Sequence, residues 1–278
     1  MLEWDETVLR ALKEDLGSGD VTTRITVNPE KRARAELLAK EDLVLAGLEV
    51  ARRAFALVDS ETAFVSACAD GDEISKGTVF ARVEGRAVSL LEAERVALNF
   101  LQRLCGIATL TRRFVAAVAG TKASITDTRK TTPGLRSMEK YAVRVGGGRN
   151  HRFSLADGVL IKENHSRAAG GIGEAVRRAR AGAPHPLKIE VEVSTLEEVA
   201  EAVEAKADIL LLDNMDVQRV RESVALVNGR ALLEVSGGMA LDSVRTFAET
   251  GVDILSVGAL THSARAMDIS MLFETGAS

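Results

Sequence analysis

Residues 209–214 read Ile-Leu-Leu-Leu-Asp-Asn and residues 231–238 read Ala-Leu-Leu-Glu-Val-Ser-Gly-Gly, two apolar runs that end in polar or glycine residues. Amphipathic segments follow them, at 217–227 and 241–250. Short apolar strands that alternate with helices at this spacing predict right-handed βαβ units around a parallel sheet.

The same alternation extends over the chain from about residue 110 onward. Six or seven such units in about 170 residues predict an α/β barrel smaller than the eight-unit form. An open doubly wound sheet is the alternative. The other predicted strands are 123–126, 158–161, 187–193 and 254–257, and the other predicted helices of this half are 172–181 and 196–205.

The first 105 or so residues have a different pattern, which predicts an α+β domain. Glycines at 71 and 85 bracket short alternating strands, and a further strand is expected at 34–40. Helices are expected at 6–16, 48–58 and 90–104. We therefore divide the chain into an N-terminal domain, 1–108, and a barrel domain, 109–278.

Composition excludes several classes of protein. The formal charge of -4 argues against a general polyanion-binding surface. Cys68 and Cys105 lie outside any CxxC motif, which favours a reducing compartment over a disulfide or metal framework. Neither an apolar signal core nor a run of about 18 apolar residues is present, so we expect a soluble cytoplasmic protein without nucleic-acid or membrane partners.

Polar residues cluster where the predicted strands end. In a parallel barrel the carboxyl ends of all strands meet at one mouth, where the active sites of such folds lie. These polar ends are Asp127–Lys130, Lys162–His165, Glu190 with Glu192, Asp213–Asn214, Ser236–Gly238 and Gly258–Ala259.

The set of cations expected at this mouth is larger than the pair of carboxylates Glu192 and Asp213. Because buried or half-buried cations need anionic partners, the surplus predicts a substrate of high negative charge. The loop 146–152 is expected to present Asn150, His151 and Arg152 to the mouth. The cationic set is Arg129, Lys130, Arg152 and Lys162, with His151 beside them.

Glu192 and Asp213 end neighbouring predicted strands. Two carboxylates near a phosphate loop suit Mg²⁺, which takes few protein ligands; an ordinary salt bridge to a nearby Lys or Arg is the alternative. Ser236-Gly-Gly and Gly258-Ala precede predicted helices, and their backbone N–H groups are candidates for binding phosphate.

Several long motifs occur in order along the chain. They are Glu14–Thr23, Asp127–Arg136, Glu139–Arg152, Leu160–His165, Glu190–Val193, Leu211–Met215, Ser236–Gly238 and Val257–Ser263. Together they resemble one family, the nicotinate-nucleotide pyrophosphorylases, also called quinolinate phosphoribosyltransferases. The resemblance implies an N-terminal α/β sandwich and a seven-stranded C-terminal α/β barrel. It also implies a reaction: quinolinate and phosphoribosyl pyrophosphate give nicotinate mononucleotide, pyrophosphate and CO₂ with Mg²⁺, in NAD biosynthesis.

The resemblance also implies roles for single residues. Lys130, Lys162, Glu192 and Asp213 are the expected catalytic residues, the last two also on the metal side. The glycine loops Ser236–Gly238 and Val257–Ala259 are expected to hold the 5-phosphate. A homodimer or higher homo-oligomer is implied, with Arg95 entering the neighbouring site. The remaining substrate-binding residues are Thr128, Arg129, His151 and Arg152.

Two other functions stay open at this point. A non-catalytic barrel could sense an anion or a nucleotide, although a sensor need not keep the whole set of carboxylates and cations. A sister transferase could act on another pyridine or purine acid.

Overall fold

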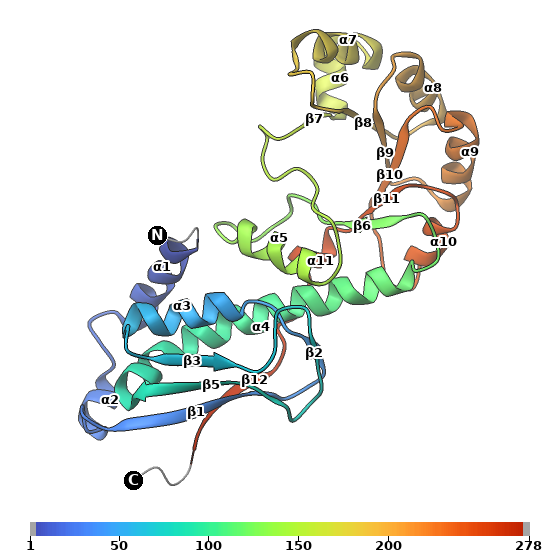
Figure 1. Ribbon diagram of the computed structural model, residues 1–278. Coiled ribbons are helices and arrows are strands. Elements are labelled where there is room, and N and C mark those ends of the chain that lie inside the picture. Colours follow the sequence, from blue (N-terminus) through green and yellow to red (C-terminus); the bar gives the residue numbers. More distant parts are fainter. Residues whose placement is uncertain (1–3, 275–278) are drawn as a thin grey trace. The chain divides into compact units, whose positions relative to one another are not determined.

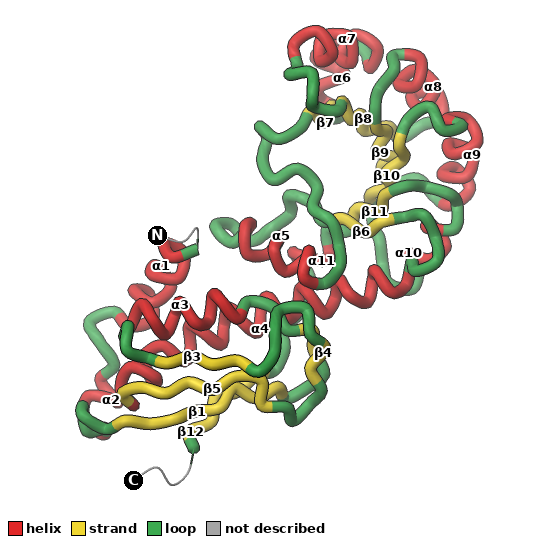
Figure 2. Tube along the Cα trace, in the orientation of Figure 1, coloured by secondary structure: helices red, strands yellow, loops and turns green. Residues whose placement is uncertain are grey.

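The computed structural model describes residues 4–274, which divide into two compact units (Figures 1 and 2). The first unit contains the residues up to Arg112, Thr132–Gly147 and the segment from Ala264 onward. The second contains Arg113–Thr131 and Gly148–Ser263. Both units are therefore discontinuous in sequence, and the domain boundary between residues 108 and 109 stays a prediction.

An antiparallel four-stranded sheet forms the framework of the first unit. In β1, the side chains of Ala35, Leu37 and Ala39 are buried, because alternate residues of a strand point to the same face. The predicted strand at 34–40 is thus confirmed. The order is β12 (Ile269–Phe273), β1 (Arg32–Ala39), β5 (Val79–Arg86) and β3 (Ala63–Ser66).

The helices of the first unit include one that is much longer than predicted. The helix expected at 90–104 is α4, Ala87–Ala117, which continues from the first unit into the second. Position 106, inside α4, requires glycine, because a Cβ there would overlap the carbonyl oxygen of Arg265. The other elements are α1 (Asp5–Leu16), α2 (Val21–Thr26), α3 (Leu48–Val58), α5 (Arg136–Val145), which was not predicted, and the paired strands β2 (Leu43–Val44) and β4 (Glu73–Ile74).

The second unit is built on a parallel sheet whose first and last strands are paired. This pairing of β6 with β11 is the connection that a barrel requires, and the prediction of an α/β barrel is confirmed. Six strands are described; at the place of a seventh, Arg149 forms a single parallel bridge to Thr126. The order is β6 (Ser124–Thr126), β11 (Ile254–Ser256), β10 (Leu232–Ser236), β9 (Ile209–Asp213), β8 (Ile189–Val193) and β7 (Val159–Ile161).

Helices follow the strands around the outside of the barrel (Figure 2). The prediction of a helix at 241–250 is wrong in extent, because α10 covers only Val244–Ala248. Residues 240–243 form a turn instead, in which the Ser243 hydroxyl donates a hydrogen bond to the Ala240 carbonyl. α6 (Glu163–Ala169) was not predicted. The others are α7 (Ile172–Gly182), α8 (Leu196–Glu204), α9 (Val217–Val227) and α11 (Ala259–His262).

Within the described part of the chain, every helix is too short or too polar to cross a lipid bilayer.

We expect Gly106→Ala to destabilise the protein by at least about 3 kcal/mol, because the methyl group has no space against backbone atoms. Urea denaturation followed by circular dichroism measures the change. Gly182→Ala is the matched control: no atom lies within 4 Å of a Cβ at the end of α7. Equal stability of the two variants would contradict the close approach at Arg265.

Candidate active site

The strand register brings the inward-facing polar groups together at two levels. Glu192, Leu211 and Glu234 are neighbours on β8, β9 and β10. One level nearer the strand ends, Asp213 of β9 pairs with Ser236 of β10. Because alternate residues share a face, the same face of β8 carries Glu190 below Glu192.

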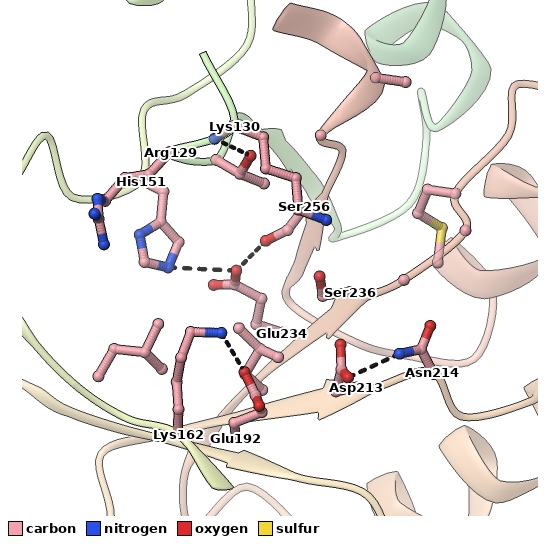
Figure 3. Close-up of a pocket in the computed structure, with 18 of the residues that line it drawn as sticks. Arg129, Lys130, His151, Lys162, Glu192, Asp213, Asn214, Glu234, Ser236 and Ser256 are labelled. Atoms are coloured by element: carbon pink, nitrogen blue, oxygen red, sulfur yellow. Dashed lines mark hydrogen bonds and ion pairs between the residues drawn. The ribbon is translucent and has the colours of Figure 1, made fainter. Parts of the chain in front are cut away.

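A cavity of about 780 Å³ opens above these strands (Figure 3). Every residue with a predicted catalytic or substrate-binding role lines this cavity except Arg95 and Val257. The Val257 side chain is fully buried, and its N–H donates to the Thr126 carbonyl. The predicted residues that line the cavity are Thr128, Arg129, Lys130, His151, Arg152, Lys162, Glu192, Asp213, Ser236, Gly237, Gly238, Gly258 and Ala259.

Two guanidinium groups give the cavity wall its positive charge. The Nε atoms of Arg129 and Arg152 are buried and have no hydrogen-bond partner among the described residues. Burial and the neighbouring charge of Arg129 lower the pKa of Arg152. A like-charged pair with unsatisfied donors is unfavourable unless an anion completes it, so this wall is suited to a carboxylate or phosphate.

The loop that carries Arg129 is held by short hydrogen bonds. The Lys130 N–H donates to Thr128 Oγ1 at 3.0 Å, and the Thr261 hydroxyl donates to the Lys130 carbonyl at 2.8 Å. These bonds connect the loop after β6 to the start of α11. The Lys130 side chain itself remains exposed at the cavity.

The two rim carboxylates have different partners. Lys162 Nζ lies 2.6 Å from Glu192 Oε2, so the salt bridge considered as the alternative to a metal site is present at Glu192. Asp213 Oδ2 accepts a hydrogen bond of 2.8 Å from the side-chain amide of Asn214. Lys162 and Glu192 neutralise each other, and the charge surplus therefore comes from Arg129, Lys130 and Arg152.

The turn after β10 can contain only glycine at its first position. Gly237 has φ 105° and Gly238 has φ 55°, both in the left-handed region. A Cβ on Gly237 would also overlap Oδ1 of Asn214, which itself has φ 54°. This close approach leaves backbone exposed at the rim beside Asp213, as a phosphate-binding turn requires.

A buried polar cluster forms the floor of the cavity. His151 Nε2 lies 3.2 Å from Glu190 Oε2 and 3.6 Å from Glu234 Oε1. The Ser256 hydroxyl donates to Glu234. Burial, and then repulsion by Glu190, raise the pKa of Glu234 to about 7. Glu234 was missed from the sequence, although an acid two residues before Ser236 on an apolar strand was a signal for an inward-facing group.

The loop 146–152 is positioned by a carboxylate that sequence reasoning had assigned to the rim. Asp127 is fully buried and accepts hydrogen bonds from the His151 N–H and from the Asn150 side chain. Asn150 therefore does not line the cavity, in contrast to its prediction, whereas His151 and Arg152 do. Asn214, expected at the mouth from its place after a predicted strand, also lines the cavity; the lining residues that were not predicted are Leu160, Leu211, Glu234, Met239, Ser256 and His262.

Two family models match the chain. The model described as "Quinolinate phosphoribosyl transferase, C-terminal domain" matches residues 107–272. The model described as "Quinolinate phosphoribosyl transferase, N-terminal domain" matches residues 20–105. Together they cover most of the sequence.

Individual proteins are similar over nearly the whole length. A probable nicotinate-nucleotide pyrophosphorylase [carboxylating] of Bacillus subtilis is 46% identical, over 93% of this chain and 89% of that protein. Quinolinate phosphoribosyltransferase [decarboxylating] 2, mitochondrial, of Nicotiana glauca is 43% identical, over 97% and 82%. The crystal structure of NadC from Streptococcus pyogenes has a TM-score of 0.94 at 43% identity, over 97% of this chain and 95% of that chain.

The raised pKa of Glu234 predicts a pH-dependent effect of Glu234→Gln on stability. The folded state keeps this proton up to a pH of about 7, whereas the unfolded chain loses it near 4.5, the ordinary pKa of a glutamate side chain. Wild-type stability therefore falls as the pH rises through this window. Between about pH 5 and pH 8 the variant should gain on the order of 3 kcal/mol relative to wild type.

Urea denaturation at both pH values measures this gain. Glu204→Gln, at an exposed position of α8, is the matched control and should show none. If the Glu204→Gln control gained as much stability between these pH values as Glu234→Gln, burial of Glu234 could not be the cause of the effect.

Proposed function

The chain belongs to the quinolinate phosphoribosyl transferase family, and from this premise we propose that it converts quinolinate and phosphoribosyl pyrophosphate to nicotinate mononucleotide, pyrophosphate and CO₂. It is then a pentosyltransferase of NAD biosynthesis, with the cavity at the barrel mouth as its active site. The substrates are two small molecules of high negative charge.

The observation that carries this proposal is the incomplete charge balance of the cavity wall. The buried Nε donors of Arg129 and Arg152 have no acceptor among residues 4–274. Planar guanidinium groups bind carboxylates in a bidentate manner, and quinolinate presents two adjacent carboxylates. The free backbone at Gly237 and Gly238 supports a site for the 5-phosphate at the opposite part of the rim.

In the first step, the pyridine nitrogen attacks the anomeric carbon of the ribose, and pyrophosphate leaves with the electron pair of the broken C–O bond. Positive charge develops at the anomeric carbon, where the carboxylates of Glu192 and Asp213 can stabilise it. Lys130 and Lys162 provide positive charge for the leaving pyrophosphate. Binding both substrates in one cavity also supplies proximity.

In the second step, the carboxylate at C2 leaves as CO₂ and its bonding electrons remain on C2. The adjacent pyridine nitrogen is now cationic and stabilises this charge electrostatically, and a proton from water then adds to C2. The guanidinium wall around Arg129 and Arg152 keeps the second carboxylate, at C3, bound through the step.

We also propose that Mg²⁺ takes part. Glu192 and Asp213 offer carboxylate oxygens on adjacent strands, and neither side chain is fully buried. This donor set fits an ion that uses few protein ligands and shares phosphate oxygens and water. When bound, Mg²⁺ would neutralise pyrophosphate charge.

The oligomeric state and the location are proposals as well. We propose a homodimer in which Arg95 enters the partner's active site. Arg95 is exposed on α4, and a site that binds anionic substrates gains affinity from another cation. A cytoplasmic location is supported by Cys68 and Cys105, two thiols that form no disulfide.

Pure protein supplied with quinolinate, phosphoribosyl pyrophosphate and Mg²⁺ should release nicotinate mononucleotide and CO₂, and chelation of Mg²⁺ should stop the release. Arg129→Gln and Arg152→Gln should each lower kcat/KM by at least about 100-fold, because each removes a charge that the bound dicarboxylate needs. Product analysis by chromatography gives both results.

The matched control is Arg221→Gln, since Arg221 is exposed on α9 and does not line the cavity. Its activity should equal that of wild type. A folded wild-type protein that binds quinolinate without forming product would be a sensor and would contradict the proposal. Turnover of a different acid alone would assign the chain to a sister transferase.

The proposed role of Arg95 predicts complementation between subunits. Arg95→Ala and Lys162→Ala proteins should each be inactive. Once mixed and allowed to exchange subunits, they should recover about one quarter of wild-type activity, since random pairing leaves one intact site in half of the dimers. Activity that stays at the level of the separate variants would contradict an exchanged arginine.

A further inference from the structure

The cluster beneath the cavity places two acids next to one imidazole inside the barrel. Glu190 is 6% exposed and Glu234 is 2% exposed. Two ionised carboxylates buried side by side repel each other strongly, and burial raises the pKa of Glu234, the less exposed of the two, to about 7, so that Glu234 holds a proton below that pH. The proposed reaction assigns no role to this arrangement.

The hydrogen bonds of His151 define the state of its ring. The backbone N–H of Arg152 donates to His151 Nδ1 at 2.8 Å. Because an amide N–H is always a donor, Nδ1 carries no proton, and the ring proton is on Nε2. That N–H points at Glu190 and Glu234, and the ring is neutral in this arrangement.

Building on the function proposed above, we propose that Glu234 is a positioning residue that, together with Glu190, fixes His151 as a neutral Nε2–H imidazole at the cavity wall. The proton of the cluster is held by Glu234, below the ring, instead of by the ring itself. His151 is then a fixed part of the wall beside the guanidinium groups and adds no further positive charge to them.

The position of Arg152 gives this arrangement its functional importance. Since His151 Nδ1 accepts the Arg152 N–H, rotation of the ring would release the backbone that carries the Arg152 guanidinium. That side chain is also tied to the Gly158 carbonyl, at 2.9 Å from Nη1. A cluster that holds the ring therefore holds one of the two guanidiniums that we assign to quinolinate.

The same three side chains could suggest a metal site, because their ligand atoms lie within 4.8 Å of one another. A metal would need a bare Nε2 and a proton on Nδ1. That tautomer would direct the Nδ1–H at the Arg152 N–H and would lose the hydrogen bond seen there. The geometry thus favours a proton-sharing cluster.

The groups that face Glu234 come from every neighbouring element. β8 contributes Glu190, the loop before β7 contributes His151, and β11 contributes the Ser256 hydroxyl. β9 contributes the apolar Leu211. Arg152 acts electrostatically on Glu190. Ionisation of Glu234 would therefore add negative charge directly below a site for anions.

The first measurement is ring-nitrogen NMR of the full chain labelled with ¹⁵N-histidine, with His151→Gln used to assign the signals of His151. At about pH 6.5 wild type should show one protonated and one bare nitrogen on this ring. Glu234→Gln should keep the same tautomer, because the amide mimics the protonated acid. Two protonated nitrogens in wild type would overturn the proposal.

The second measurement is the pH profile of kcat/KM for quinolinate. Glu234→Gln should stay within several-fold of wild type near pH 6.5, whereas Glu234→Ala should lose at least about ten-fold through a raised KM. Above pH 7 wild type should decline more steeply than Glu234→Gln. Identical profiles for wild type and Glu234→Gln would overturn the proposal, as would full activity of Glu234→Ala.

These two measurements separate the inference from the proposed function. The NMR result needs no turnover, so a protein that fails to make nicotinate mononucleotide can still confirm or contradict the tautomer. Glu204→Gln, exposed on α8, is the matched control and should leave both the His151 signals and the pH profile unchanged.

Discussion

The parallel pairing of β6 with β11 is the constraint on which the site depends. It joins the first strand of the barrel to the last, so that segments more than a hundred residues apart end at one mouth. The loop with Arg129 and Lys130 then lies next to the turn at Gly258, and the Thr261–Lys130 hydrogen bond connects the two. Without this pairing, the cations and the glycine turns would belong to separate edges of a sheet.

Charge is distributed through the barrel in layers. At the mouth, Arg129, Lys130 and Arg152 exceed the carboxylates that remain after Lys162 has paired with Glu192. Beneath the cavity, the buried Glu190 and Glu234 bring negative charge that is reduced by burial, through the raised pKa of Glu234. A positive rim above a partly neutralised acidic floor can hold small polyanions near the opening and keep them out of the barrel interior.

The sequence predicted the strands and the rim because both follow a local pattern. An apolar run that ends in Asp213-Asn214 or in Ser236-Gly237 is visible without a structure, and the barrel geometry then brings these ends together. The role of Arg95 and the reaction came from the family resemblance, because the hydrophobic periodicity of the sequence gives no information about either. The requirement for glycine at position 106 inside α4 depends on a long-range contact, the approach of Arg265 from the far end of the chain, which no local pattern contains.

For other residues of the site, the role depends on whether the side chain faces the cavity or the protein interior, and the sequence alone did not predict this orientation. Val257 lies in a matching motif, but its side chain points into the packing around the barrel. Asp127 looked like a rim residue and instead anchors the loop of His151 from within. Glu234 lay in an apolar run with no sign of its partners, because Glu190 and Ser256 come from strands distant in sequence.

The guanidinium wall formed by Arg129 and Arg152 should receive the two carboxylates of quinolinate, and a crystal structure of the protein with quinolinate bound would show this. We expect electron density for the pyridine acid in the barrel mouth, with its carboxylates within hydrogen-bond distance of Arg129 and Arg152. Density for quinolinate at another place, with both guanidiniums left facing solvent, would contradict it.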